Sequence, residues 1–317
     1  MRLDLPFDTL LPENGSVLIA GMGGGFDLFC GLPIYFELIR RGYKAHLANL
    51  SFAALKEYQE GQWLSPTLVG VGPGAANLSG YHPERFLSRW FREVQGEEVT
   101  VWCFDAAGAQ PLAEDYRTLV TRLKIDGIIL IDGGVDSLTR GDEALCGTIL
   151  EDYVSLAAVS LLPEVPMRVM ACIGMGVEGD VSHARVFENI AALTQTGGFL
   201  GVSALLSQSP ACRLYEQALE YVHSQPQQQP SVINASVVSA ARGYFGDYHL
   251  TERTRGSELW ISPLMNLYWF FTVAAVAKQN RFLSQLQQTQ TMGDVFGATY
   301  EAREQMLLRP TLPIRLP

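Results

Sequence analysis

The chain has 317 residues, a formal net charge of −10, and 48% hydrophobic but only 18% charged residues. This composition supports a sizeable hydrophobic core and excludes a disordered protein. The acidic balance argues against a nucleic-acid-binding groove, which needs a dense basic surface. We therefore expect a globular protein that binds a small-molecule ligand and no nucleic acid.

Cysteine usage and the N-terminus both favour a cytoplasmic protein. The five cysteines are odd in number, lie far apart and form no C-x-x-C pair, so neither a zinc knuckle nor a disulfide framework is expected. The first residues, MRLDLPFDTLLPENG, carry acids and prolines where a signal peptide needs a basic end and an unbroken apolar run. We expect reduced, mostly buried thiols in the cytoplasm.

One apolar stretch, Leu259–Ala277, has a length comparable to a membrane span, but Ser262, Pro263, Asn266 and Thr272 interrupt it. Ser262 as an N-cap, with Pro263 at the first helical position, predicts that a helix begins inside the stretch. The remaining apolar segment is shorter than the ~20 residues that a bilayer requires. We predict a buried helix here and no membrane-spanning segment.

Apolar runs alternate with amphipathic segments along most of the chain. The first unit combines a buried strand at Ser16–Ala20, a helix at Leu28–Arg41 and a second strand at Lys44–Leu50. Such a β–α–β unit implies a parallel pair of strands with a right-handed crossover.

The same alternation continues to the C-terminal region. Further strands are predicted at Thr67–Val71, Val99–Phe104, Gly127–Ile131, Met167–Ile173, Phe199–Ala204 and Val232–Ser239. Further helices are predicted at Pro83–Val94, Pro111–Lys124, Thr148–Leu162 (with a capping box), His183–Gln195, Ser209–His223 and Asp294–Leu308. The pattern predicts an α/β protein with a doubly wound, mostly parallel sheet and helices on both faces. We expect a single domain over residues 1–317, with residues from about 231 onward elaborating it.

A glycine-rich loop, Gly21–Asp27, follows the first strand. It matches the first two glycines of the dinucleotide motif G-x-G-x-x-G, but Phe26 stands at the third, and Asn49 replaces the acid expected after the second strand. Asp27 would also place a negative charge where a phosphate normally sits. Two interpretations remain open: a tight turn capped by Asp27, or a loop that binds a ligand hydroxyl or a metal. The ligand-binding candidates are Gly23, Gly24, Gly25 and Asp27.

The segment from Asp132 to Gly147 follows the Gly127–Ile131 strand and has no obvious regular structure, so we expect a long exposed loop of functional importance. Its carboxylates are the oxygen ligands that Mg²⁺ or Ca²⁺ prefers, and we assign a metal site to Asp132 and Asp136. The neighbouring Gly133 and Gly134 are candidates for ligand contact. The alternative is that Asp136 makes turn hydrogen bonds while Asp142 and Glu143 are solvated.

Glu178 and Asp180 repeat the acidic theme after the next strand. Neighbouring strand ends face one crevice, so Glu178 and Asp136 are candidates for proton transfer. Glu151 and Asp152 are assigned only to the start of the following helix.

A basic loop follows the last predicted strand. Arg242, Arg253 and Arg255 have the chemistry to grip a phosphate or carboxylate, and His249 is a candidate general acid–base. Asp247 and Ser257 are further candidates for ligand contact. The alternative is a salt-bridged loop that covers the acidic loops of the same site.

Several motifs together resemble the uncharacterised family catalogued as domain of unknown function 1152. They are GMGGGFD, IDGGVDSLTRGDE, GTILED and RGYFGDYH…TRGSELWISPL, and the similarity spans nearly the whole chain. The resemblance implies a Rossmann-like fold and no assigned activity. A weaker likeness is to nucleoside hydrolases, whose calcium site uses aspartates just past a strand. Those aspartates follow the first strand, where this chain has its glycine loop.

These features favour an enzyme, a metal-assisted hydrolase or transferase acting on a phosphorylated or ribosyl metabolite at the carboxyl ends of the strands. Mg²⁺ or Ca²⁺ is the expected cofactor. One alternative is a non-catalytic nucleotide or metabolite sensor, forming a homo-oligomer through an aromatic helix at Tyr268–Phe271. A nicotinamide-dependent oxidoreductase is disfavoured by the incomplete glycine motif.

Overall fold

A computed structural model describes residues 5–58, 60–74 and 80–314. Its main feature is a nine-stranded sheet with strand order β3-β4-β5-β2-β1-β6-β7-β11-β8. The middle of this sheet is parallel. The parallel strands are β1 (Ser16–Gly21), β2 (Lys44–Leu50), β5 (Val101–Phe104), β6 (Gly127–Gly133) and β7 (Met167–Ile173).

Antiparallel strands extend the sheet at both edges. At one edge, β4 (Leu68–Val71) pairs with β5, and β3 (Gln62–Ser65) pairs with β4. At the other, β11 (Leu267–Thr272) lies between β7 and β8 (Phe199–Ala204) and is antiparallel to both. The prediction of a Rossmann-like, mostly parallel sheet is confirmed.

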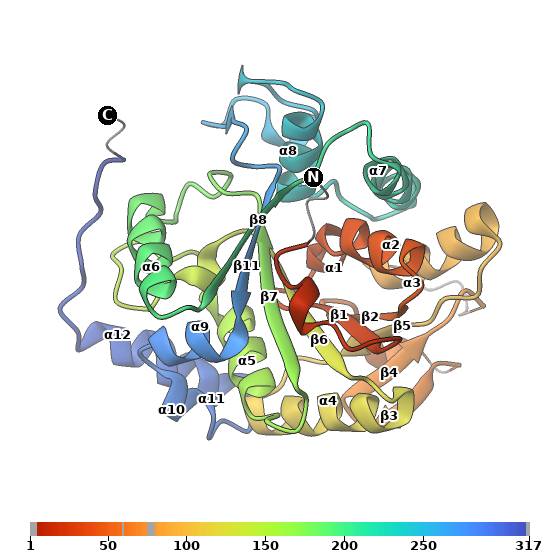
Figure 1. Cartoon of the computed structure of the whole chain (residues 1–317), viewed down its shortest axis with the longest axis horizontal. Helices are drawn as coiled ribbons and strands as arrows, with labels where there is room; N and C mark the ends of the chain where they lie inside the picture. Colours follow the sequence, from red (N-terminus) through yellow and green to blue (C-terminus); the bar gives the residue numbers. More distant parts are fainter. Residues whose placement is uncertain (1–4, 59, 75–79, 315–317) are drawn as a thin grey trace.

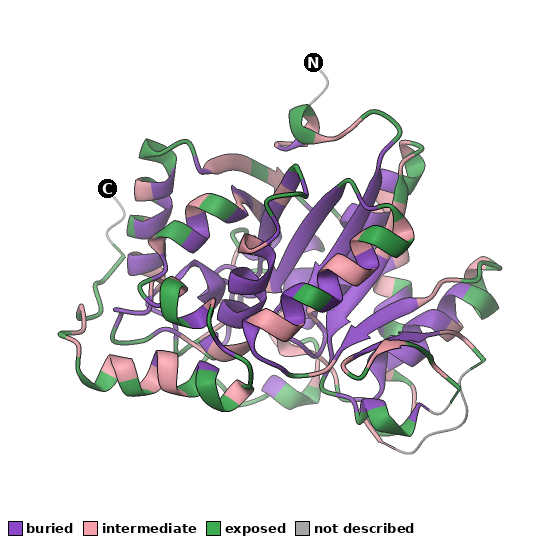
Figure 2. Cartoon of the chain, turned by 90° about the horizontal axis from the view of Figure 1, so that it is seen from below, coloured by how far each residue is buried: buried purple, intermediate pink, exposed green. Residues whose placement is uncertain are grey.

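Side chains of the central strands alternate between two hydrophobic cores. Leu18 of β1 and Leu130 of β6 face one core, whereas Ile19 and Ile131 face the other. All four are fully buried, which explains why these strands appear in the sequence as continuous apolar runs rather than as alternating ones. Figure 2 shows the strands buried at the centre, with exposed residues on the outer surfaces of the helices.

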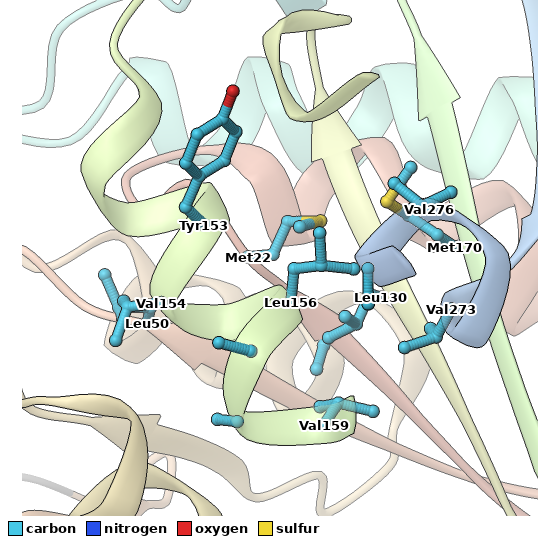
Figure 3. Close-up of a cluster of buried hydrophobic side chains, with 14 of the residues drawn as sticks. Met22, Leu50, Leu130, Tyr153, Val154, Leu156, Val159, Met170, Val273 and Val276 are labelled. Carbon is cyan, nitrogen blue, oxygen red and sulfur yellow. The ribbon is translucent and has the colours of Figure 1, made fainter. Parts of the chain in front are cut away.

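Helices cover both faces of the sheet (Figure 1). One core is closed by α4 (Ala109–Leu123), α5 (Ile149–Ser160), α6 (His183–Gln195), α9 (Val273–Gln279), α10 (Leu283–Leu286) and α11 (Met292–Phe296). In Figure 3, Leu156 of α5 and Val276 of α9 lie beside Leu130 in this core. The other core is closed by α1 (Asp27–Cys30), α2 (Leu32–Arg40), α3 (Pro83–Trp90), α7 (Pro210–His223) and α8 (Val232–Ala241).

The connections after two neighbouring strands, β1 and β6, run to opposite faces of the sheet. After β1 the chain continues into α1 and α2 on one face, whereas after β6 it reaches α5 on the other. The carboxyl ends of strands whose connections diverge in this way are where ligands bind in open α/β sheets.

The predicted strand at Val232–Ser239 is wrong, because this segment forms α8. Ser231 caps it, accepting a hydrogen bond from the Asn234 backbone N–H at 3.2 Å. The helix is buried on nearly all sides, so its sequence lacks an amphipathic stripe, and a short apolar run of this kind cannot be distinguished from a strand by periodicity.

The predicted buried helix in Leu259–Ala277 is also wrong. The stretch contains β10 (Trp260–Ile261), which pairs with β9 (Gly246–Asp247), then a turn, β11 and the short α9. Ser262 and Pro263 begin the turn instead of a helix, and the Met265 backbone N–H donates to the Ser262 carbonyl at 3.1 Å. The aromatic segment Tyr268–Phe271 is therefore a strand inside the sheet, and the helix invoked for oligomerisation does not exist.

The C-terminal helix predicted at Asp294–Leu308 is divided into α11, a π-helical turn and α12 (Ala302–Glu304). All five cysteines are buried and none forms a disulfide. Within residues 5–58, 60–74 and 80–314, no helix has the length and apolarity needed to span a bilayer.

Candidate functional site

Three aspartates converge where β1, β6 and α5 meet. One carboxylate oxygen from each of Asp27, Asp132 and Asp152 lies within 4.8 Å of the other two. Asp27 begins α1, Asp132 stands near the end of β6, and Asp152 lies in the first turn of α5. We refer to these three residues as the aspartate cluster, and Figure 1 locates the elements that carry them.

Backbone contacts hold these elements together. The Met22 N–H donates to the Ile131 carbonyl at 2.9 Å, which extends the pairing of β1 and β6 toward the cluster. The Ser155 hydroxyl donates to the Met22 carbonyl at 2.8 Å and ties α5 to the glycine loop. The aspartates are thus positioned by regular elements and by the loop that follows β1.

The glycines of this region leave space for the carboxylates. A Cβ atom on Gly23 would lie 2.6 Å from Asp27 Oδ2 and 2.8 Å from Asp152 Oδ1, and one on Gly133 would lie 2.8 Å from Asp27 Oδ1. The Gly23 N–H also donates to Asp27 Oδ2 at 2.7 Å. Gly24 has φ of +90°, a conformation that favours glycine. The glycine loop therefore admits carboxylates, and Asp27 takes the backbone donor that a phosphate would need.

Two further carboxylates, Asp136 and Glu178, flank the aspartate cluster. Asp136 accepts a hydrogen bond from the Thr148 backbone N–H at 2.9 Å, and Glu178 accepts one from the Val135 backbone N–H at 2.8 Å. Both are close enough to the cluster to raise the pKa of Asp152. Gly134 packs against Glu178, since a Cβ atom there would lie 2.9 Å from its carboxylate.

Burial and mutual repulsion dominate the electrostatics of the site. Burial, followed by the charges of Asp132 and Asp136, raises the pKa of Asp27 well above its ordinary value. Burial raises the pKa of Asp132 to about 6, although hydrogen bonds from Ser137 oppose it. The pKa of Asp152 is raised by burial and then by the charges of the neighbouring carboxylates.

Asp152 is the least satisfied member of the cluster. It is only 3% exposed, and its Oδ1 has no hydrogen-bond partner. Among the described residues, no ion pair with lysine, arginine or histidine involves any of the five carboxylates. A buried charge without a partner is costly. The five carboxylates therefore lack the positive charge that would offset the cost of their burial.

Asp152 is not predicted from the sequence as a site residue, because an acid in a first helical turn has an ordinary explanation. The capping box predicted at the start of this helix is wrong. The Thr148 side chain makes no cap hydrogen bond, and the Thr148 backbone N–H donates to Asp136 instead. An acid pair directly after an acidic loop is the pattern that could have identified Asp152.

The second half of the Asp132–Gly147 segment has a different role. Arg309 forms ion pairs with Asp142 at 2.7 Å and with Glu143 at 2.6 Å, and Arg281 also contacts Asp142 at 3.1 Å. Glu143 is fully buried. The interpretation of these two acids as solvated is therefore wrong: they anchor the C-terminal region. The segment as a whole is mostly buried and contains a 3₁₀ turn at Asp136–Leu138, so the expected long exposed loop is also corrected.

Residues of the predicted basic loop bind mainly to one another and to nearby acids. Arg242 pairs with Glu216 at 2.8 Å, and Arg255 pairs with Glu252 at 2.9 Å. The remaining contacts are His249 with Asp247 at 2.8 Å and with Thr254 at 3.0 Å, and the Ser257 hydroxyl donating to the Thr254 carbonyl at 2.7 Å. These contacts match the salt-bridged part of the alternative. None of them joins the loop to the aspartate cluster, so they give no support to the part in which the loop covers the acidic loops.

Arg253 is the residue of this loop with a link to the site. It donates to the Pro230 carbonyl at 2.8 Å and lies close to Tyr81. Burial, followed by the charges of Glu84 and Asp27, raises the pKa of Tyr81, and Arg253 opposes these effects. A Cβ atom on Gly25 would lie 3.3 Å from the Tyr81 hydroxyl, which places Tyr81 beside the glycine loop.

Comparison with known proteins identifies the family. A family model described as "Protein of unknown function (DUF1152)" matches residues 55–305, well over half of the chain. No curated protein and no solved structure matches. The match includes the IDGGVDSLTRGDE motif, although the glycine loop at Gly21–Asp27 lies before the matched residues. It confirms the suspected family, and the chain belongs to the DUF1152 family.

Proposed function

We propose that Asp27, Asp132 and Asp152 bind a divalent cation, Mg²⁺ or Ca²⁺, and that the chain is a metal-assisted enzyme. The proposed reaction is hydrolysis or group transfer on a small phosphorylated or ribosyl metabolite. Carboxylate oxygens are the ligands that these hard cations prefer. The observation that carries the proposal is the buried, unpartnered Oδ1 of Asp152 within a cluster that contains no positive charge.

A purely structural role explains the cluster less well. Like charges held within 4.8 Å of one another repel, and their burial adds a desolvation cost. At another pair of buried carboxylates, Asp142 and Glu143, the chain supplies arginines. A bound cation would relieve both costs in the aspartate cluster.

The surrounding residues have chemistry suited to such an enzyme. A bound cation would polarise a phosphoryl or hydroxyl oxygen of the substrate. Glu178 and Asp136, which backbone N–H groups hold beside the cluster, would transfer protons. Burial and then the charge of Asp132 raise the pKa of Glu178, which brings this carboxyl closer to the range where general acid–base catalysis is efficient. Arg253, near Tyr81 and the glycine loop, is the candidate contact for a substrate anion.

A nicotinamide cofactor is less compatible with these residues. Asp27 accepts the Gly23 N–H, and Asn49 donates to the Gly25 carbonyl at 3.0 Å and to Glu84 at 2.8 Å. The groups that would hold a pyrophosphate and a ribose are thus engaged inside the protein.

The test is thermal unfolding of EDTA-treated protein with added Mg²⁺, Ca²⁺ or Mn²⁺. We expect at least one cation to raise the melting temperature, since a ligand at 100 times its Kd stabilises a protein by about 2.7 kcal/mol. Asp132→Asn should abolish this response, whereas Asp247→Asn, at an exposed aspartate outside the cluster, should retain it. An unresponsive wild type, or an Asp132→Asn variant that responds normally, would contradict the cation site.

The enzymatic part of the proposal needs a separate assay. Cation-loaded protein should turn over a substrate in a panel of phosphate esters and nucleosides, and Glu178→Gln should lose turnover while keeping the thermal response to the cation. A wild type that binds a panel member without turnover would instead show that the chain is a metabolite sensor.

A further inference from the structure

A hollow of about 700 Å³ lies away from the aspartate cluster, at the amino-terminal end of β8. Its lining includes Arg140, Lys278, Asn280 and Arg281, and it contains none of the five carboxylates of the candidate site. The helices α6 and α9 approach each other here (Figure 1), and Gln279 of α9 donates to the Asn189 carbonyl of α6 at 3.5 Å. We refer to this hollow as the cationic pocket.

The lining has an excess of positive charge. Arg140, Lys278 and Arg281 contribute three cations, and no aspartate or glutamate lines the pocket, although the whole chain carries a net charge of −10. The nearest ion-pair partner is Asp142, which is 3.7 Å from Arg140 and 3.1 Å from Arg281 and is shared with Arg309. Asp142 thus pairs with three arginines, of which Arg309 also pairs with Glu143 and Glu188. Lys278 has no ion pair within the described ranges.

Two residues that line the pocket carry a buried hydrogen-bond donor without an acceptor. Asn280 is 7% exposed, and its Oδ1 accepts the Phe282 backbone N–H at 2.9 Å, but its Nδ2 has no partner. The Nε of Arg140 is also buried without a partner. An unmade hydrogen bond of a buried donor costs roughly 1–3 kcal/mol, so an acceptor-rich ligand would stabilise this region.

The position of Lys278 in the last turn of α9, and of Arg281 just beyond it, has a structural explanation as well, because cations interact favourably with helix C-termini. That explanation does not account for Asn280. The last carbonyls of α9 already accept the Asn280 backbone N–H. The interaction between a helix dipole and nearby cations provides no acceptor for the neutral Nδ2 donor of Asn280. The combination of excess charge and unpartnered donors is what indicates a ligand.

We propose that the cationic pocket binds a small phosphate-bearing anion, with Lys278 and Arg281 contributing charge and Asn280 and Arg140 donating hydrogen bonds. Phosphate oxygens accept several such bonds at once, and arginine is well suited to them. The site is independent of the proposed cation site, although Arg140 belongs to the same chain segment as Asp132.

Pyrophosphate is the probe for this site, titrated calorimetrically into EDTA-treated protein so that the aspartate cluster holds no metal. We expect saturable binding to the wild type and at least tenfold weaker binding to Lys278→Glu and to Asn280→Asp. Asn280→Asp keeps an oxygen for the Phe282 N–H while replacing the donor with a negative charge, so its folding should be preserved. Lys56→Glu makes the same charge change as Lys278→Glu at an exposed position outside the pocket lining and should leave binding unchanged.

Three results would overturn the proposal: no binding by the wild type, equal loss of affinity in Lys56→Glu and Lys278→Glu, or tighter binding of citrate than of pyrophosphate. The cation-induced rise in melting temperature should be unaffected in Lys278→Glu. This readout separates failure of the cationic pocket from failure of the proposed metal site.

Discussion

The two halves of the Asp132–Gly147 segment each bury a pair of carboxylates, but their surroundings are opposite. Asp132 and Asp136 lie among other acids, and burial raises the pKa of both. Burial also acts to raise the pKa of Asp142, but Arg309, Arg140 and Arg281 outweigh it and leave this pKa below its ordinary value. Glu143 likewise contacts Arg309.

This contrast is the reason for assigning a structural role to Asp142 and Glu143 and for proposing a functional role for the acids of the first half. A buried carboxylate is tolerated when the chain itself supplies a cation, and the second half of the segment meets this condition. The first half does not, and Asp152 adds a further uncompensated charge. The missing cation, rather than the number of acids, is therefore the feature that indicates a ligand.

The largest expected effect comes from breaking the structural half. Arg309→Ala would leave Asp142 and the fully buried Glu143 without their main cation, and loss of one partner of a buried pair costs roughly 3 kcal/mol. Urea unfolding of the EDTA-treated protein measures the change. Arg213→Ala, at an exposed arginine that forms no ion pair among the described residues, is the control and should alter stability by less than about 0.5 kcal/mol. Similar stability of the two variants would contradict the assigned role of Arg309.

The aspartate cluster should respond in the opposite direction. Asp152→Asn removes one of several repelling charges, so the metal-free protein should gain about 1–2 kcal/mol of unfolding free energy while losing its cation response. Asp115→Asn is a matched comparison, because that buried carboxylate accepts hydrogen bonds from Ser65 and Thr67, both at 2.6 Å, and should be needed for stability. A destabilised Asp152→Asn variant would show that the charge at this position is compensated within the chain.

A smaller effect is expected from crowding the cluster. The methyl group of Gly23→Ala would meet Asp27 and Asp152 at less than 3 Å and force them apart, so the cation affinity should fall about tenfold, equivalent to about 1.4 kcal/mol. Gly72→Ala, where an added Cβ has no neighbour within 4 Å, should bind the cation as the wild type does. Titration followed by thermal shift distinguishes the two; equal affinities would argue that Gly23 does not border the cation.

The smallest effect is a pH dependence of the structural half. Because the folded-state pKa of Asp142 lies below its ordinary value of 3.8, its stabilising contribution is present above pH 3.8 and is lost as the pH falls through the lower folded-state value. The destabilisation caused by Arg309→Ala should therefore shrink when unfolding is measured below pH 3.8 instead of at pH 7. A pH-independent difference between the variant and the wild type would contradict the ion pair.

Much of the fold could be predicted from local sequence. β2 and β7 have the predicted bounds, because short apolar-rich segments flanked by turns are typical of strands. α8 and β11 could not be predicted in this way. One is a helix that is buried on most sides, and the other is a strand inserted between β7 and β8 by pairing with distant residues.

The site was partly predictable for the same reason. Asp27, Asp132 and Asp136 lie at the carboxyl end of a strand or in the loop that follows it, where the architecture itself suggests a site. The roles of Asp142 and Glu143 depend on Arg309, which lies far along the chain. Asp152 belongs to the aspartate cluster because of where the fold places α5. Charge compensation is a property of the folded chain, so sequence spacing alone does not separate the two halves.

The most direct test of the account is a crystal structure of the protein soaked in Mn²⁺, with anomalous scattering used to locate the ion. We predict an anomalous peak bonded to oxygens of Asp27, Asp132 and Asp152, and its loss in Asp152→Asn crystals soaked in the same way. Wild-type crystals at saturating Mn²⁺ in which the three carboxylates remain without an ion, or in which manganese binds only elsewhere, would contradict the account.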